Sequence, residues 1–130
     1  MIDFKNAAFV KLKKVGNEVG QSMVGQLLLS GEQIVSSYKG IRDEVIFTNK
    51  RIIAVNVQGF TGAKKDYTSL PYSKIQAYSV ETAGTAEKLF ALGADCELEL
   101  YFSSLGMVKF EFTGATDIRE ISRVISEYVL

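Results

Sequence analysis

The sequence predicts a mainly β domain: a seven-stranded antiparallel sandwich or half-open barrel, with an N-terminal helix before it and a C-terminal helix capping it. Two observations support this prediction. Across residues 31–113 apolar residues alternate with polar ones, and turn residues interrupt the pattern about every 8–12 residues. Residues 114–130 then switch to helical spacing. A chain of 130 residues, 47% hydrophobic, suits a single domain over residues 1–130.

Residues 1–30 are predicted as an N-terminal helical segment. Apolar residues from Phe9 to Leu28 fall near helical spacing. Glycine weakens this prediction, because each Gly inside a helix costs about 1 kcal/mol relative to Ala. The glycines concerned are Gly16, Gly20 and Gly25. We therefore expect a loose start, followed by a helix from about Glu18 to Leu29.

The strand region, residues 31–113, begins where the apolar period changes to two. Five strands are expected in its first part: Gln33–Lys39, Asp43–Thr48, Arg51–Gln58, Lys64–Leu70 and Lys74–Glu81. Asn49 tolerates positive φ, so the second and third strands should form a tight hairpin. Pro71 has no N–H to donate, which suits the end of a strand.

Two more strands follow an interruption at 82–95. Within it, Ala86–Leu92 could form about two helical turns. Cys96–Phe102 and Val108–Phe112 then alternate cleanly, with a turn at Ser103–Gly106 between them. Apolar residues on one face and charged residues on the other indicate antiparallel strands with one solvated side.

The C-terminal helix is expected within residues 114–130. Either Thr116 or Asp117 can cap it, and Glu120 lies three residues past Asp117, as a capping box prefers. One stripe of the helix is apolar: Ile118, Ile121, Val124, Ile125, Tyr128 and Val129. Such a stripe must pack on something apolar, which here is the sheet.

Several segments resemble the bacterial pleckstrin-homology (PH) domains. Glu44–Val55 reads EVIFTNKRIIAV, similar to the FTNKR-(I/L) strand-turn-strand signature of that family. The segments Gly59–Gly62, Lys64-Lys65, Leu70–Ile75 and Tyr78–Gly84 match further. The resemblance implies a PH-like fold of two antiparallel sheets with a capping C-terminal helix. It also implies soluble bacterial proteins that assemble into homo-oligomers, often rings, without naming a ligand. Thr85–Asp95 departs from it, being longer and more apolar than the family's short acidic link.

Composition argues against an enzyme. The chain has no histidine and one cysteine, which removes the commonest general base and the usual zinc-ligand sets. Cys96 is in phase with Leu98, so we expect a core cysteine. Glu97 and Glu99 fit the solvated face of a strand better than a catalytic acid–base pair. Together with Asp95 they could be considered as ligands of a hard cation, but they lack the loop spacing of such a site. We expect no catalytic residues, no metal and no cofactor.

Charge and hydropathy restrict location and partners. The net charge is zero, which argues against a nucleic-acid partner. No apolar run approaches the roughly 20 residues of a membrane helix. Lysines are scattered through residues 1–14, so this segment has no long apolar region of the kind a signal peptide needs. The expected location is therefore the cytoplasm. Residues 1–65 carry ten basic and five acidic residues, and residues 66–130 carry five and ten, so the halves have net charges of +5 and −5.

This asymmetry favours a non-enzymatic interaction or scaffold domain that binds itself, as a homo-oligomer larger than a dimer, which forms a ring when the rotation between copies permits closure. The alternative is binding of an anionic membrane surface or a phosphorylated ligand, since eukaryotic PH domains bind inositol phosphates at basic hairpin residues. The candidate ligand-binding residues are Lys39, Arg42, Lys50, Arg51, Lys64 and Lys65. Solvated charge without any ligand would explain the same residues.

Overall fold

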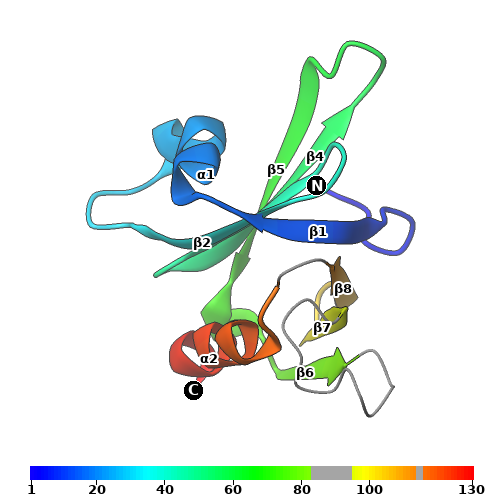
Figure 1. Ribbon diagram of the computed structural model, residues 1–130. Helices are drawn as coiled ribbons and strands as arrows, with labels where there is room; N and C mark the ends of the chain where they lie inside the picture. Colours follow the sequence, from blue (N-terminus) through cyan, green and yellow to red (C-terminus); the bar gives the residue numbers. More distant parts are fainter. Residues whose placement is uncertain (83–94, 114–115) are drawn as a thin grey trace.

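The structure, a computed structural model, describes residues 1–82, 95–113 and 116–130. Its strands form one sheet of eight strands (Figure 1). The strand order is β5-β4-β3-β2-β1-β8-β7-β6. The strands are β1 (Phe9–Val15), β2 (Ile34–Lys39), β3 (Glu44–Thr48), β4 (Arg51–Gln58), β5 (Lys64–Pro71), β6 (Ala77–Thr82), β7 (Cys96–Phe102) and β8 (Gly106–Phe112). The helices are α1 (Asn17–Val24), α2 (Ile118–Val129) and the 3₁₀ turns η1 (Gly25–Leu27) and η2 (Tyr72–Lys74).

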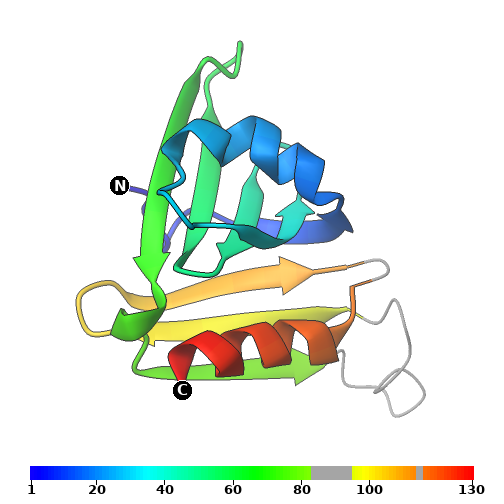
Figure 2. The same cartoon turned by 90° about the vertical axis from the view of Figure 1, so that its left-hand side faces the viewer.

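The sheet folds into two layers, as the turned view shows (Figure 2). Strands β2–β5 make one layer and β6–β8 the other. Strand β1 joins them, because it pairs antiparallel with β2 and parallel with β8. The end strands β5 and β6 do not pair with each other, so the sheet is a half-open sandwich, as predicted. It has eight strands where seven antiparallel ones were predicted, because β1 is added and pairs parallel with β8.

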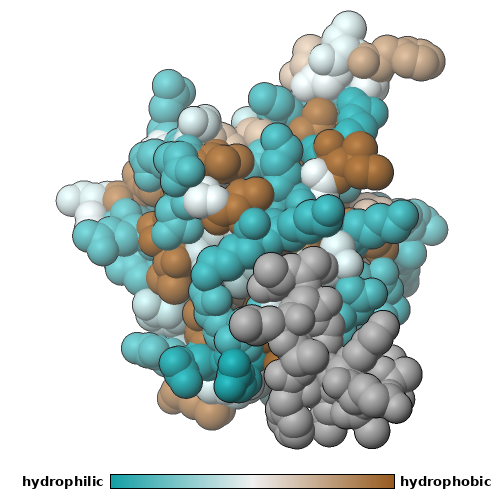
Figure 3. All heavy atoms as spheres, in the orientation of Figure 1, coloured by the Kyte–Doolittle hydropathy of each residue, from teal (hydrophilic) through white to brown (hydrophobic). Residues whose placement is uncertain are grey.

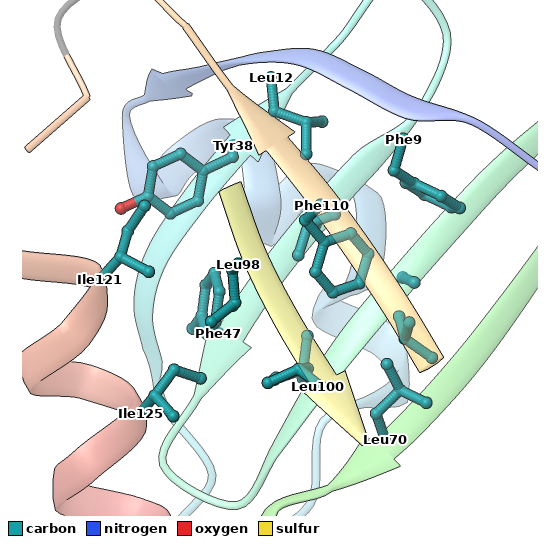
Figure 4. Close-up of a cluster of buried hydrophobic side chains, with 14 of the residues drawn as sticks. Phe9, Leu12, Tyr38, Phe47, Leu70, Leu98, Leu100, Phe110, Ile121 and Ile125 are labelled. Carbon is teal, nitrogen blue, oxygen red and sulfur yellow. The ribbon is translucent and has the colours of Figure 1, made fainter. Parts of the chain in front are cut away.

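The main core lies between the layers and under α2 (Figure 4). Phe110 is fully buried, and its ring meets that of Phe9 edge-on with centroids 5.4 Å apart. From the other side α2 contributes Ile121 and Ile125. Each fully buried side chain of this size stabilises the fold by about 1.5–3 kcal/mol. The predicted apolar stripe of the C-terminal helix therefore packs as expected.

A second, smaller core lies on the outer face of the β2–β5 layer, where α1 covers it. Val24 of α1 packs there against Ile46, Ile53 and Val55. Strand β3 is consequently buried on both faces, which explains why its three central residues, Val45–Phe47, are apolar without alternation.

The prediction of a helical segment over residues 1–30 is wrong at Phe9–Val15, which form β1. The cause is a bulge: Lys11 has a φ of 55°, and the pairing with β8 shifts between Phe9 and Leu12. Burial along β1 therefore repeats at every third residue, which imitates the spacing of a helix. The helix itself begins at Asn17, close to the predicted start.

The other elements agree with expectation in kind. Arg51–Gln58 is β4 to the residue, whereas β6 begins later than predicted because Tyr72–Lys74 form η2. The Asp117 carboxylate caps α2 by accepting a hydrogen bond of 2.9 Å from the Arg119 N–H. The expected turns at Ala86–Leu92 lie outside the described residues. In the part of the chain that is described, no helix has the length and apolar character that crossing a membrane requires.

Candidate functional site

Two hairpin turns lie together at one end of the β2–β5 layer. The β2–β3 turn spans residues 40–43, the β4–β5 turn spans residues 59–63, and the Arg42 guanidinium donates a hydrogen bond to the Gly59 carbonyl between them. We call these two turns and the residues at their bases the hairpin end. Four of the six predicted ligand-binding residues lie there: Lys39, Arg42, Lys64 and Lys65.

The tips of the two turns expose large apolar side chains. Ile41 is 88% exposed and Phe60 is fully exposed. Gly59 and Gly62 flank Phe60 with φ near 78° and 68°, a backbone that other residues adopt only at a cost. In the space-filling view, hydrophobic atoms protrude from the tip of the projecting β4–β5 hairpin (Figure 3). Ile41 and Phe60 are not among the residues predicted from the sequence to bind a ligand, although an aromatic residue inside a glycine-bounded turn is a signal that the sequence contains.

A groove of about 330 Å³ opens between the two turns on the side that faces α1. Lys39 and Arg42 contribute its cationic side chains, and Phe60 also lines it. The remaining lining residues are Met23, Ile41, Glu44, Val57, Thr61 and Gly62.

Glu44 lines this groove and is almost completely buried, with 1% of its surface exposed. Its Oε1 atom has no hydrogen-bond partner among the described residues. Burial raises the pKa of the Glu44 carboxyl, and the nearby ammonium groups of Lys39 and Lys65 partly oppose that shift. The groove therefore holds a proton-binding group between cations.

The other two predicted residues lie at the opposite end of the layer. Lys50 belongs to the β3–β4 turn. Arg51 is bound to the buried Glu32, with Nε 2.9 Å from Oε2 and Nη2 3.0 Å from Oε1, and it also donates to Ser69 and Leu27. These two residues are not brought together with the hairpin end.

The hydrogen bonds of this network keep the Glu32 carboxyl ionised. Burial alone would raise the pKa of its carboxyl, but hydrogen bonds from Arg51, the Leu29 N–H and the Thr48 hydroxyl lower it to about 2. Arg51 is thus part of the scaffold below the β3–β4 turn, and its guanidinium is already occupied by a carboxylate.

Cys96 lies in the core, as predicted. Burial, with the nearby carboxylate of Asp95, raises the pKa of its thiol to about 11. A thiol with so high a pKa is a poor nucleophile.

An acidic face covers the outside of the β6–β8 layer. Carboxylate oxygens of Glu81, Glu97 and Glu99 lie within 4.8 Å of one another, and Lys109 Nζ lies 3.6 Å from Glu111. Burial and the neighbouring glutamates raise the pKa of Glu97, while Lys109 opposes that shift. The structure places the predicted solvated pair, Glu97 and Glu99, on this outer face. Asp95 is not part of the cluster, and its carboxylate instead accepts a hydrogen bond from Thr113.

Comparison with known proteins gives one consistent family. The family model described as "Bacterial PH domain" matches residues 3–129. Two proteins of Bacillus subtilis (strain 168) are similar. The uncharacterized protein YjqA is 36% identical over 108 residues, covering 82% of each chain, and the uncharacterized protein YozO is 32% identical over 103 residues, covering 79% of this chain and 83% of its own.

Two solved structures are similar in both fold and sequence. A DUF1696 family protein with a pleckstrin-homology domain from Shewanella loihica PV-4 superimposes with a TM-score of 0.78 at 34% identity, covering 93% of this chain and 99% of its own. A pleckstrin homology domain from Shewanella amazonensis SB2B gives a TM-score of 0.65 at 33% identity, covering 96% and 93%.

Proposed function

The chain belongs to the bacterial PH domain family, and from that premise we propose that it is a non-enzymatic binding domain whose hairpin end attaches to an anionic membrane surface. One observation carries the proposal. Ile41 and Phe60 protrude from adjacent turns; Arg42 lies in the first of these turns, and Lys39, Lys64 and Lys65 lie at their bases. The apolar tips can enter the apolar interior of a membrane while the basic residues behind them contact the anionic head groups.

The expected attachment is weak and reversible. Each Lys or Arg near an anionic surface contributes about 1 kcal/mol, and a Phe side chain that leaves water contributes about 1.5–3 kcal/mol. Arg42 is tied to the Gly59 carbonyl and so holds the two turns in a fixed relation, which lowers the cost of ordering them on the membrane.

Co-sedimentation with vesicles tests this function. Binding to vesicles that mix phosphatidylglycerol with phosphatidylcholine should exceed binding to phosphatidylcholine alone. Phe60→Ser should weaken it about tenfold, and the double change Lys64→Gln, Lys65→Gln should weaken it by a similar factor that salt reduces.

Matched controls come from other surfaces. Lys50→Gln removes a charge from the opposite end of the layer, and Tyr101→Ser removes an exposed aromatic ring from β7. Neither should change vesicle binding. Equal losses in the control and hairpin-end variants, or no binding by the wild type at low salt, would refute the proposal.

Self-association is a second candidate function, favoured by a different observation. The outer face of β6–β8 is acidic around Glu97, whereas the hairpin end is basic, and among the described residues no further strand pairs with the outer edges of β5 and β6. Complementary patches and free strand edges suit a head-to-tail contact between copies, which closes into a ring when the rotation permits.

Light scattering coupled to gel filtration measures this directly. A particle larger than a dimer at low salt, which shrinks when Glu97→Lys and Glu99→Lys reverse the acidic face, would support self-association. A monomer of 14.3 kDa at all micromolar concentrations would exclude it and leave membrane attachment as the function.

A further inference from the structure

We propose that the groove below the hairpin tips is a phosphodiester site in which Glu44 takes up a proton as the anion binds, so that attachment strengthens as the pH falls. The inference rests on the proposed membrane function and adds to it a ligand position and a regulating residue.

The geometry places the Glu44 carboxylate close to cationic side chains. Glu44 is the first residue of β3 and lies directly opposite Lys39 of β2. On its other side it faces Val55 of β4, whose partner on β5 is Tyr67, and Lys65 of β5 lies two residues further along, opposite Val57. Arg42 of the turn also lines the groove.

The other residues that line the groove carry no charge, since α1 contributes Met23 and β4 contributes Val57. The carboxylate of the preceding residue, Asp43, accepts hydrogen bonds from Asn56 and the Val57 N–H. Among the described residues no ion pair within 4.0 Å reaches Glu44, and its Oε1 has no hydrogen-bond partner. The ionised carboxylate is therefore supported mainly by the fields of Lys39 and Lys65, and by no direct contact to its Oε1.

An anion in the groove changes that balance. A phosphodiester bound to Lys39 and Arg42 neutralises Lys39, one of the two charges that favour the Glu44 carboxylate, and adds a negative charge beside it. A proton on Glu44 removes the repulsion. By linkage, a site that takes up a proton on binding binds more tightly at lower pH, and the ligand raises the proton affinity by the same factor.

The composition makes the effect measurable. The chain has no histidine, so the side chain that usually titrates between about pH 5 and pH 8 is absent. Phosphatidylglycerol is the suitable probe, because its phosphodiester stays singly charged in this range. A phosphomonoester lipid would itself titrate near pH 6, as phosphate esters do.

The experiment compares wild type and Glu44→Gln on phosphatidylglycerol–phosphatidylcholine vesicles at about pH 5 and about pH 8. Wild type should bind about tenfold more tightly at the lower pH, a coupling of ordinary size. Glu44→Gln keeps the side-chain volume, should bind at pH 8 at least as tightly as wild type, and should lose most of the pH dependence. Glu127→Gln is the control, because Glu127 is an exposed carboxylate of α2 that lies outside both the hairpin end and the acidic face; it should keep the wild-type profile.

Calorimetry of the wild type in buffers of different ionisation enthalpy gives a readout that needs no variant. Binding should take up protons. Replacing vesicles with the soluble diester glycerophosphoglycerol separates two sources, since proton uptake with the soluble diester assigns a free phosphodiester and uptake with vesicles alone assigns a lipid.

Vesicle binding without proton uptake, or an unchanged pH profile in Glu44→Gln, would overturn the role of Glu44 and leave membrane attachment intact. If the wild type binds no vesicles at any pH, both the role of Glu44 and the proposed membrane attachment are refuted.

Discussion

Glu32 and Glu44 are both buried glutamates of the β2–β5 layer, and their surroundings give them opposite properties. Hydrogen bonds from Arg51, Leu29 and Thr48 reach Glu32 and hold its pKa down despite burial. Glu44 has an unpartnered oxygen, and burial raises its pKa. Neither difference is visible in the sequence, because the partners of Glu32 lie up to 19 residues away and are brought to it only by the fold.

Glu32→Ala should destabilise the protein by about 3 kcal/mol near neutral pH, because it leaves Arg51 without its buried partner. The folded pKa of Glu32, about 2, is lower than the ordinary 4.5, so its contribution is complete above pH 4.5 and disappears as the pH falls toward 2. Urea unfolding at several pH values should show that the difference in unfolding free energy between Glu32→Ala and wild type shrinks as the pH falls from 4.5 toward 2. Glu127→Ala, an exposed change, should cost no more than about 0.5 kcal/mol, and a Glu32 cost no larger than that would contradict the network.

At the scale of elements, a strand was predicted where its apolar residues alternate, or form a short run bounded by turn residues, as in β3 and β4. Strands such as β7 and β8 alternate cleanly and were predicted. Strand β1 was missed because the bulge at Lys11 changes its burial period from two to three. The glycines of α1 were interpreted as weakening a helix, yet Gly20 is buried and lets α1 approach β2: a Cβ there would overlap the Ser37 hydroxyl.

Gly20→Ala should therefore destabilise by about 1–3 kcal/mol, although alanine is the better helix former. Gly25→Ala is the control, because it has helical φ and ψ and an added Cβ would meet only the flexible end of Gln21. That change should be neutral or stabilise by up to about 1 kcal/mol. Thermal or urea unfolding of the two variants decides the matter, and a stabilising Gly20→Ala would show that α1 does not pack this closely on β2.

Part of the candidate site could be predicted from the sequence. The basic residues of the hairpins were identified from composition and the family resemblance, and four of the six lie together. The sequence could not show that Arg51 is occupied by Glu32, nor that Lys50 lies at the far end. The apolar tips were missed because alternation describes strands and gives no information about turns.

For the whole molecule, the separation of charge along the sequence becomes a separation between layers, with basic residues around the hairpin end and acidic ones on the outer face of β6–β8. The two proposed functions are compatible on this arrangement. A ring of copies would present several hairpin ends to one membrane, and simultaneous weak contacts raise the overall affinity far above that of one domain.

The most direct test of the proposed attachment is the fluorescence of a Phe60→Trp variant, which would be the only tryptophan in the chain. With phosphatidylglycerol-containing vesicles its emission should shift to the blue and intensify as the side chain leaves water, and phosphatidylcholine vesicles should have no effect. Tyr101→Trp, on the exposed face of β7, should not respond. An emission unchanged by acidic vesicles at low salt, or an equal response from both positions, would contradict membrane attachment through the hairpin end.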